Sequence, residues 1–237
     1  MRIEQFEEIL GLKTPIVSVT RIKEEISKGE LTQCALSGIL KAAENEMIYL
    51  TANSVPCYGA ITGFGFVDGL PNTPGGYGNF ISHGKGEGYP KGEKVKSCPD
   101  IAEKMLLGQP QNVMLGYKSI CIKKYQDSDN CDTVLILASP DQISGLIHLF
   151  NFNRSEYDNV IAPMVSGCAS IFRIPFSEIG KEKSRAIIGN IDIGSRKHFP
   201  KDTFIFVVTN KDFQTMLNDA DDCFFQTENW HELRKRN

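Results

Sequence analysis

Apolar residues recur three or four positions apart in several parts of the chain, which is the spacing of an amphipathic helix. A glycine, which commonly ends a helix, follows the first of these segments, and a serine before a proline, a favourable helix start, precedes a later one. The expected helices cover 2–10, a segment that begins near Thr32 or Gln33, 100–107, the residues after Ser139, Gly167 to Phe172, and the residues after Asn210. Pro175 should end the helix that starts at Gly167, because proline has no backbone N–H to donate.

Short runs rich in β-branched residues lie between these helices and predict strands. They cover Ile16–Thr20, Met47–Thr51, 119–125, 132–138, Val160–Ala162 and 203–208. The run 132–138, DTVLILA, is almost entirely apolar, so we expect it to be a central strand that is buried on both faces.

Strands and helices interleave without a βαβ unit of constant length. We therefore expect an α+β (mixed α/β) fold, a single compact domain over 1–237 with a central mixed sheet flanked by helices. A long glycine-rich excursion interrupts it at 59–92 and holds 11 of the chain's 21 glycines. Loops of this length are uncommon in compact domains and tend to be functional when they are ordered, although a mobile surface loop is the alternative.

Composition narrows the class of protein. The chain has 237 residues with 26 Lys and Arg against 29 Asp and Glu, a formal charge of −3, and 41% hydrophobic residues, which is ordinary globular composition. No basic patch with interleaved aromatic residues is present, so we expect no nucleic-acid partner. The start of the chain lacks a signal-peptide core and no window is apolar enough to span a membrane, so a cytoplasmic protein without a membrane partner is expected.

Seven cysteines are the main carriers of candidate chemistry. An odd number without tight pairing argues against a secreted disulfide framework, and no C-x-x-C supports a zinc ribbon, a ferredoxin-type run or a thioredoxin motif. Cys34, Cys57 and Cys168 are expected at the starts of elements, where ligation is easier than inside a helix. Cys34 should lie in the first turn of its helix, where the dipole lowers a thiol pKa. The alternative is that the cysteines are small buried hydrophobes.

The glycine-rich excursion offers a second kind of site. Gly84, Lys85 and Gly86 combine backbone N–H groups that can turn toward an anion with a positive charge, although the spacing is not that of a Walker loop. Arg196, close to His198, could also meet an anion. The four histidines are scattered and no G-x-S-x-G elbow occurs, so the sequence assigns no catalytic residue.

Several of these residues belong to a pattern that resembles a known family. Cys34-Ala35-Leu36, Leu50-Thr51-Ala52-Asn53, Cys57, Gly65-Phe66, Asp132-Thr133-Val134-Leu135, Pro140-Asp141-Gln142 and Gly194-Ser195-Arg196 carry the likeness. Together they resemble the uncharacterised ArCR family, domain of unknown function 169, whose members are mostly from archaea and anaerobic bacteria. The likeness runs roughly from Pro15 to Leu217, and no activity is established for the family.

The resemblance implies a particular set of cysteines. Cys34, Cys57 and Cys168 fall on family cysteine positions, and Asp192 stands where many relatives have a fourth cysteine. A carboxylate can replace a thiolate on iron or zinc, or the site may have been lost.

Three hypotheses follow. The first is a redox-related metal or iron–sulfur protein in which these three thiols are ligands to iron or zinc and Asp192 is a fourth ligand. Its partner would be an anionic substrate held near Arg196 or a redox protein. The second is a binding module for a small anionic ligand, with the glycine-rich segment as a lid and the cysteines in the core. The third is thiol redox chemistry by Cys34. The sequence does not show whether the three cysteines meet in space.

Overall fold

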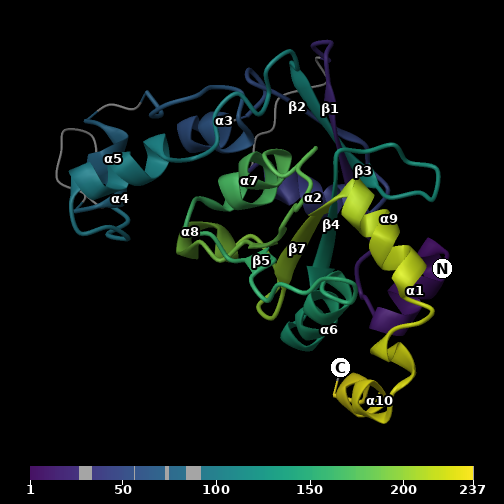
Figure 1. Ribbon diagram of the computed structural model, residues 1–237. Coiled ribbons are helices and arrows are strands. Elements are labelled where there is room, and N and C mark those ends of the chain that lie inside the picture. The colour runs from purple at the N-terminus through teal and green to yellow at the C-terminus, as the bar shows by residue number, and fades with distance from the viewer. Residues whose placement is uncertain (27–33, 56, 73–74, 84–91, 237) are drawn as a thin grey trace.

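A seven-stranded sheet forms the centre of the computed structural model, which describes residues 1–26, 34–55, 57–72, 75–83 and 92–236 (Figure 1). The strands are β1 (Val17–Ile22), β2 (Ile48–Thr51), β3 (Ser119–Lys124), β4 (Thr133–Ala138), β5 (Val160–Ile161), β6 (Ala186–Gly189) and β7 (Phe204–Thr209). Their order is β2-β3-β1-β4-β7-β6-β5. The pair β5 and β6 is parallel and every other pair is antiparallel, so the sheet is mixed and open.

β4 occupies the middle of this order, and all six of its residues are buried. Its register with β7 pairs Thr133 with Thr209 and Ala138 with Phe204. Alternate side chains of β4 enter different clusters, Leu135 and Leu137 on one face of the sheet and Val134 and Ile136 on the other. The apolar run therefore predicted the central strand correctly.

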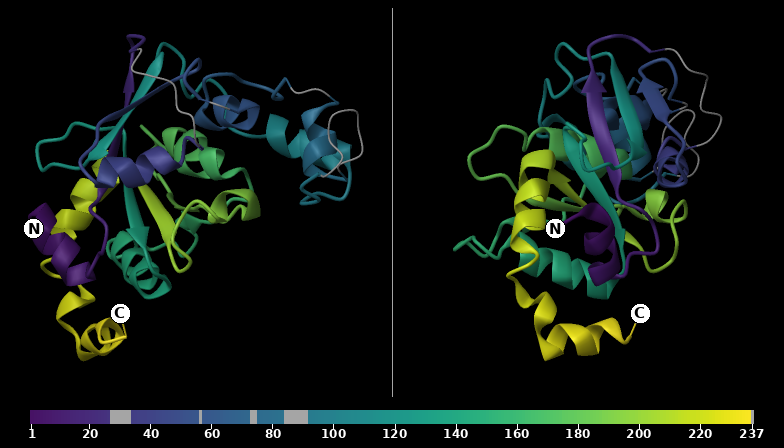
Figure 2. Two further views of the ribbon diagram at one scale, coloured as in Figure 1. Left: turned by 180° about the vertical axis from the view of Figure 1, so that it is seen from behind. Right: turned by 90° about the vertical axis from the view of Figure 1, so that its right-hand side faces the viewer.

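Helices cover both faces of the sheet (Figure 2). They are α1 (Ile3–Leu10), α2 (Ser37–Ala43), α3 (Tyr58–Phe64), α4 (Tyr77–Ile81), α5 (Pro99–Leu107), α6 (Pro140–Phe150), the π-helix η1 (Ala169–Arg173), α7 (Ile174–Phe176), α8 (Ile193–Arg196), α9 (Asn210–Asp219), the 3-10 helix η2 (Phe224–Gln226) and α10 (Glu228–Arg234). Apolar residues of α2, α3, η1 and α7 form one core with one face of the sheet. Residues of α1, α6, α9 and α10 form the core of the other face. The fold is thus a single α+β domain, as the pattern predicted.

α4 and α5 stand away from the sheet and form a small lobe at the left of Figure 1. Ile81, Ala102 and Leu106 make a separate apolar cluster there, with Tyr77 and Phe80 packed against it. The lobe lies inside and just after the glycine-rich excursion of 59–92, which the sequence predicts to be a long loop. The excursion instead includes α3 and α4, while 73–74 and 84–91 are outside the described residues.

Most predicted helix starts and ends are confirmed. Gly11 ends α1 in the left-handed conformation, with φ of 65°. Ser139 begins α6 with a capping box, in which its hydroxyl accepts from Gln142 N and the Gln142 side chain accepts from the Ser139 N–H. Thr209, rather than Asn210, caps α9, because its hydroxyl accepts from Asp212 N.

The prediction that Pro175 ends a helix is wrong, because the helix that starts at Gly167 continues to Phe176. The π-helical turn of η1 precedes the proline and changes the hydrogen-bonding register, which accommodates the missing N–H. α2 begins at Ser37, not near Thr32 or Gln33, and these two residues lie outside the described part of the chain. In the part that the structure describes, no helix is both long and apolar enough to cross a membrane.

Candidate functional site

The predicted ligand residues stand where helices begin. Cys57 is the N-cap of α3, and its Sγ accepts a hydrogen bond from Ala60 N at 3.3 Å. Cys168 lies in the turn that leads into η1, where the Ser166 hydroxyl accepts from Ala169 N at 3.3 Å. Asp192 is the N-cap of α8 and accepts from Gly194 N at 3.3 Å.

Cys34 lies just before α2 rather than in its first turn. Its carbonyl oxygen accepts from Ser37 N at 2.9 Å and from the Ser37 hydroxyl at 2.7 Å, so it belongs to the turn that leads into the helix. The prediction that Cys34 lies in the first turn of the helix is therefore wrong, because α2 begins at Ser37, three residues after Cys34.

These residues, far apart in the sequence, share one neighbourhood. Burial raises the pKa of the Cys168 thiol well above its ordinary value, and Cys57, Cys34 and Asp192 raise it further by their charge. Burial also raises the pKa of Cys57, with a smaller contribution from Cys34, while N–H donation from Ala60 opposes the rise. The three cysteines and Asp192 therefore lie in one region of the fold, near enough to influence one another's charge, which the sequence could not show.

The three thiols differ in access. Cys168 is buried, Cys34 is half-buried and Cys57 is exposed. The group therefore extends from the core of the molecule to its surface. Among the described residues, no group of three or more His, Cys, Asp and Glu side chains has an arrangement that would hold a single metal ion as it stands.

Close packing of α3 on η1 sets the position of Cys57 relative to Cys168. A β-carbon at Gly63 would lie 2.7 Å from Cys168 Cβ and 3.1 Å from Ala169 N, so only glycine allows this approach. The sequence places Gly63 in a glycine-rich segment, but nothing in that pattern distinguishes it from its neighbours.

A buried arginine also connects α3 to η1 through hydrogen bonds. Arg173, at the end of η1, is 1% exposed and donates from Nε to Thr62 O of α3 at 2.7 Å. Its Nη1 bonds Asp68 Oδ1 at 2.9 Å and its Nη2 donates to Val67 O at 2.6 Å. Sequence reasoning gave no signal for this residue, because its partners are mainly carbonyl groups.

Asn190 lies between the Cys168 helix and α8. Its backbone N donates to the Ser170 hydroxyl at 3.2 Å, and its Oδ1 accepts from the Ser195 hydroxyl at 3.0 Å. The residue is fully buried in the left-handed conformation, with φ of 61°. Its Nδ2 has no hydrogen-bond partner in the described structure, which is a costly state for a buried donor.

A cavity of about 90 Å³ lies between the α4–α5 lobe and the segments that lead into η1 and α8, and Asp192 is part of its lining. Its polar lining consists of Tyr77, Glu93, Ser166 and Asp192, and the rest is apolar. Burial raises the pKa of Tyr77, and the charges of Cys57, Cys168, Asp192 and Glu93 raise it further, so this phenol is neutral at pH 7.

The other predicted site residues are not part of this neighbourhood as described. The guanidinium of Arg196 donates to the carbonyls of Thr203 and Lys201 and lies 4.7 Å from the Phe204 ring centroid. Its role in binding an anion stays a prediction. Gly84, Lys85 and Gly86, the predicted anion cradle, lie outside the described residues. All seven cysteines are free thiols, and several are buried.

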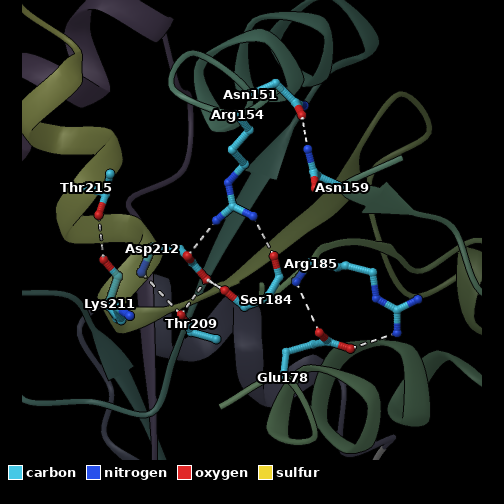
Figure 3. A network of polar contacts seen from close by, with 10 residues as sticks. All are labelled: Asn151, Arg154, Asn159, Glu178, Ser184, Arg185, Thr209, Lys211, Asp212 and Thr215. Carbon is cyan, nitrogen blue, oxygen red and sulfur yellow. Dashed lines mark hydrogen bonds and ion pairs between the residues drawn. The ribbon is translucent and has the colours of Figure 1, made fainter. Parts of the chain in front are cut away.

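A second polar cluster lies on another part of the sheet and involves Glu178 and Asp212 (Figure 3). Asp212 accepts from Arg154 at 2.8 Å, from the Ser184 hydroxyl at 2.7 Å and from the Thr209 hydroxyl at 2.6 Å. These contacts satisfy the buried carboxylate, so the cluster has a structural role. It connects the end of β7 and the start of α9 to Ser184, which lies just before β6.

Comparison with known proteins identifies the family. The chain matches the family described as uncharacterised ArCR, domain of unknown function 169, over residues 5–219, and it belongs to that family. The match includes the cysteine neighbourhood and ends before η2 and α10. No curated protein and no solved structure matches the chain. The family has no known function, so the chemistry must be argued from the site.

Proposed function

We propose that Cys34, Cys57 and Cys168 hold an iron–sulfur cluster, and that the protein acts through this cysteine site. The proposal rests on three thiols from separate elements that lie near enough to influence one another's charge. A cluster is several atoms across, so its thiolate ligands are spread more widely than those around one ion. Three neighbouring thiols supply the type of ligand that such a cluster needs.

The electrostatics of the site support a cationic iron centre. Beyond the larger effect of burial, Cys34 raises the pKa of Cys57, and Cys57, Cys34 and Asp192 raise the pKa of Cys168, so neighbouring negative charge disfavours a thiolate at these two positions. Metal ions remove this repulsion and keep coordinating thiols deprotonated. The apolar surroundings of Cys168 then exclude water from the buried side of the cluster.

A hydrogen-bond donor at one of the thiols also fits a cluster. The Ala60 N–H donates to Cys57 Sγ at 3.3 Å. Hydrogen bonds to the sulfur atoms of a cluster tune its reduction potential. When bound, the cluster would supply electron transfer or an iron position that is open to a ligand.

The proposal has two forms, which differ in whether Asp192 is the fourth protein ligand of the cluster. Both oxygens of Asp192 are near backbone N–H groups, Gly167 N for Oδ2 at 3.3 Å and Gly194 N for Oδ1 at 3.3 Å. These bonds orient the carboxylate and leave further lone pairs for iron. A site with three thiolates and Asp192 suits an electron carrier with a redox partner, and a site with three thiolates alone suits binding of a small ligand.

The test is an anaerobic purification with analysis of iron, zinc and acid-labile sulfide per chain. We expect a brown protein with stoichiometric iron and sulfide, and a loss of at least 80% of both in Cys57→Ser. Cys98→Ser is the matched control, because Cys98 is another accessible N-cap cysteine, at the start of α5, and should keep its iron.

Stoichiometric zinc without acid-labile sulfide would mean that the cysteines hold a zinc ion rather than an iron–sulfur cluster. Folded, metal-free wild-type protein would overturn the proposal and make the cysteines core residues. Equal iron in Cys57→Ser and wild type would do the same for the assigned ligands.

A further inference from the structure

The helix that carries Cys168 contains a π turn, and this turn lies directly after the cysteine. The helix runs from Gly167 to Phe176, with η1 between an α-helical start and an α-helical end. The Ile174 N–H donates to Ala169 O, five residues back, which is the hydrogen bond of a π turn rather than of an α-helix. Single π turns within α-helices are rare and occur frequently at functional sites.

The π turn allows two residues five positions apart to face α3 together. Cys168 lies against α3, because a β-carbon at Gly63 would be 2.7 Å from Cys168 Cβ. Arg173 faces the same helix, since its Nε donates to Thr62 O at 2.7 Å. In an α-helix, residues with this spacing lie about 140° apart around the axis. The hydrogen bond between residues five apart in a π turn instead brings them onto nearly the same face.

The other side of the π turn packs on the end of β6. The Ser170 hydroxyl accepts from Asn190 N at 3.2 Å. A β-carbon at Gly189 would lie 3.0 Å from Ile171 Cγ1 and 3.2 Å from Ser170 Oγ, so β6 approaches the turn closely. The turn is therefore held between α3 and β6, and a rotation of Cys168 about the helix axis requires a change in the hydrogen-bonding register.

Pro175 gives a reason for the π register. In a continuous α-helix its ring would clash with the carbonyl group of Ile171, four residues earlier, and its missing N–H would leave that carbonyl without a partner. The wider π turn relieves this conflict, because its hydrogen bonds connect residues one position further apart. Pro175 is buried in α7, directly after the π turn, so it favours the π register at this place in the helix.

We infer that Pro175 is a positioning residue of the cysteine site. By favouring the π register it turns Cys168 toward α3, the helix that Cys57 begins. A return to a continuous α register would rotate Cys168 by about 100° relative to Arg173, which is bonded to α3, and Cys168 would no longer face that helix. The role in cluster binding rests on the proposed function, whereas the orientation of Cys168 can be measured without metal.

The experiment makes two measurements on full-length Pro175→Ala. The first, on chelator-treated protein, is the nuclear Overhauser contact between the Gly63 α-protons and the Cys168 β-protons, which reports the orientation of Cys168. We expect the contact in wild type and its loss in Pro175→Ala. The second is iron per chain after anaerobic purification, which should fall by at least half in the variant, because one thiol has turned away from the site.

Pro140→Ala is the matched control. Pro140 is also a helix proline, but it occupies the first position of α6, where an N–H would have no partner within the helix. Its replacement should change neither measurement. Pro175→Leu gives a second route in case the alanine leaves a cavity that prevents folding, because leucine also restores the N–H and fills the apolar space.

An unchanged Overhauser contact in folded Pro175→Ala or Pro175→Leu would overturn the assignment of Pro175, even if urea unfolding shows a lower stability. A lost contact with unchanged iron would overturn its role in cluster binding. Wild-type protein without iron would refute the cluster proposal, whereas the Overhauser contact decides separately whether Pro175 orients Cys168.

Discussion

Glu178 is a buried carboxylate whose contribution to stability depends on its protonation state. It is 1% exposed, and its Oε1 accepts from Arg185 and from Lys181, each at 2.9 Å. Burial raises the pKa of this carboxyl, but the hydrogen bonds from Arg185 and Lys181 lower it more, so the pKa lies below its usual value. The folded state therefore binds the proton more weakly than the unfolded state does.

This predicts how the stability of the protein changes with acid. The contribution of Glu178 is fully present above the ordinary glutamate pKa of about 4.3 and is lost as the pH falls through the lower pKa of the folded state. Glu178→Gln should cost about 1–3 kcal/mol at pH 7, because two charge-assisted bonds are weakened, and the difference from wild type should shrink in acid. Urea unfolding at a series of pH values measures both.

Glu156→Gln serves as the control, since Glu156 pairs with Lys183 on the surface and its replacement should change stability very little. A stability difference between Glu178→Gln and wild type that stays constant from neutral to acid pH would contradict the assignment.

At the same scale, the sequence predicted the ligand candidates but not the residues that position them. Cys34, Cys57 and Cys168 were selected among seven cysteines because they were expected at the starts of elements and fall on cysteine positions of the family that the sequence resembles. Gly63 and Arg173 did not, because a close approach between helices and a set of carbonyl acceptors leave no pattern along the chain. Tyr77 joins the cavity only through packing of the α4–α5 lobe.

At the scale of elements, the contact between α3 and η1 determines the geometry of the cysteine site. Phe64 of α3 packs on Phe172 of η1 with ring centroids 4.5 Å apart, and Gly63 lies against Cys168. Since Cys57 begins α3, any shift of this helix changes the distance between Cys57 and Cys168.

Gly63→Ala should therefore disturb both stability and the site. The added methyl group would meet the backbone of Ala169 and Cys168 Cβ, so α3 must move away, at a cost of about 1–3 kcal/mol. On the cluster proposal, iron per chain should fall by at least half. Metal analysis and urea unfolding of the same preparation give the two readouts.

Gly145→Ala is a matched control on the other face of the sheet. A β-carbon there would lie 2.6 Å from the ring of Trp230, so this variant should also lose stability. It should keep its iron, because α6 and α10 are remote from the cysteines. Equal loss of iron in the two variants would mean that iron binding depends on general stability rather than on the α3–η1 contact.

Elements with a strong periodic pattern were predicted well, and those held by tertiary contacts were not. α1, α6 and the central strand β4 follow directly from apolar spacing and capping residues. α3 was missed because three of its seven residues are small and its apolar side chains form no long stripe. β6, only four residues long, lies between polar segments and is defined by its pairing with β7.

At the scale of the whole molecule, the sheet separates two cores with different roles. One core contains the starts of α2, α3 and η1, and hence the cysteine site. The other contains α1, α6, α9 and α10, where Trp230 Nε1 donates to Ile9 O at 3.3 Å and Arg234 Nη1 donates to Leu10 O at 2.8 Å. The C-terminal helix that completes this second core lies beyond the family match, which ends at residue 219.

On the cluster proposal, this division predicts which elements open more readily when the metal is removed. A cluster held by Cys34, Cys57 and Cys168 would connect three elements that the chain otherwise joins through long segments, so it stabilises them against local opening. Hydrogen exchange followed by mass spectrometry should show about tenfold faster exchange at 58–64 and 167–173 after chelation of iron. Exchange in α6 and α9 should stay the same, because their hydrogen bonds depend on the opposite core. Cys57→Ser should show the faster pattern before and after chelation, and a uniform increase over both faces would show that the site stabilises the fold as one unit.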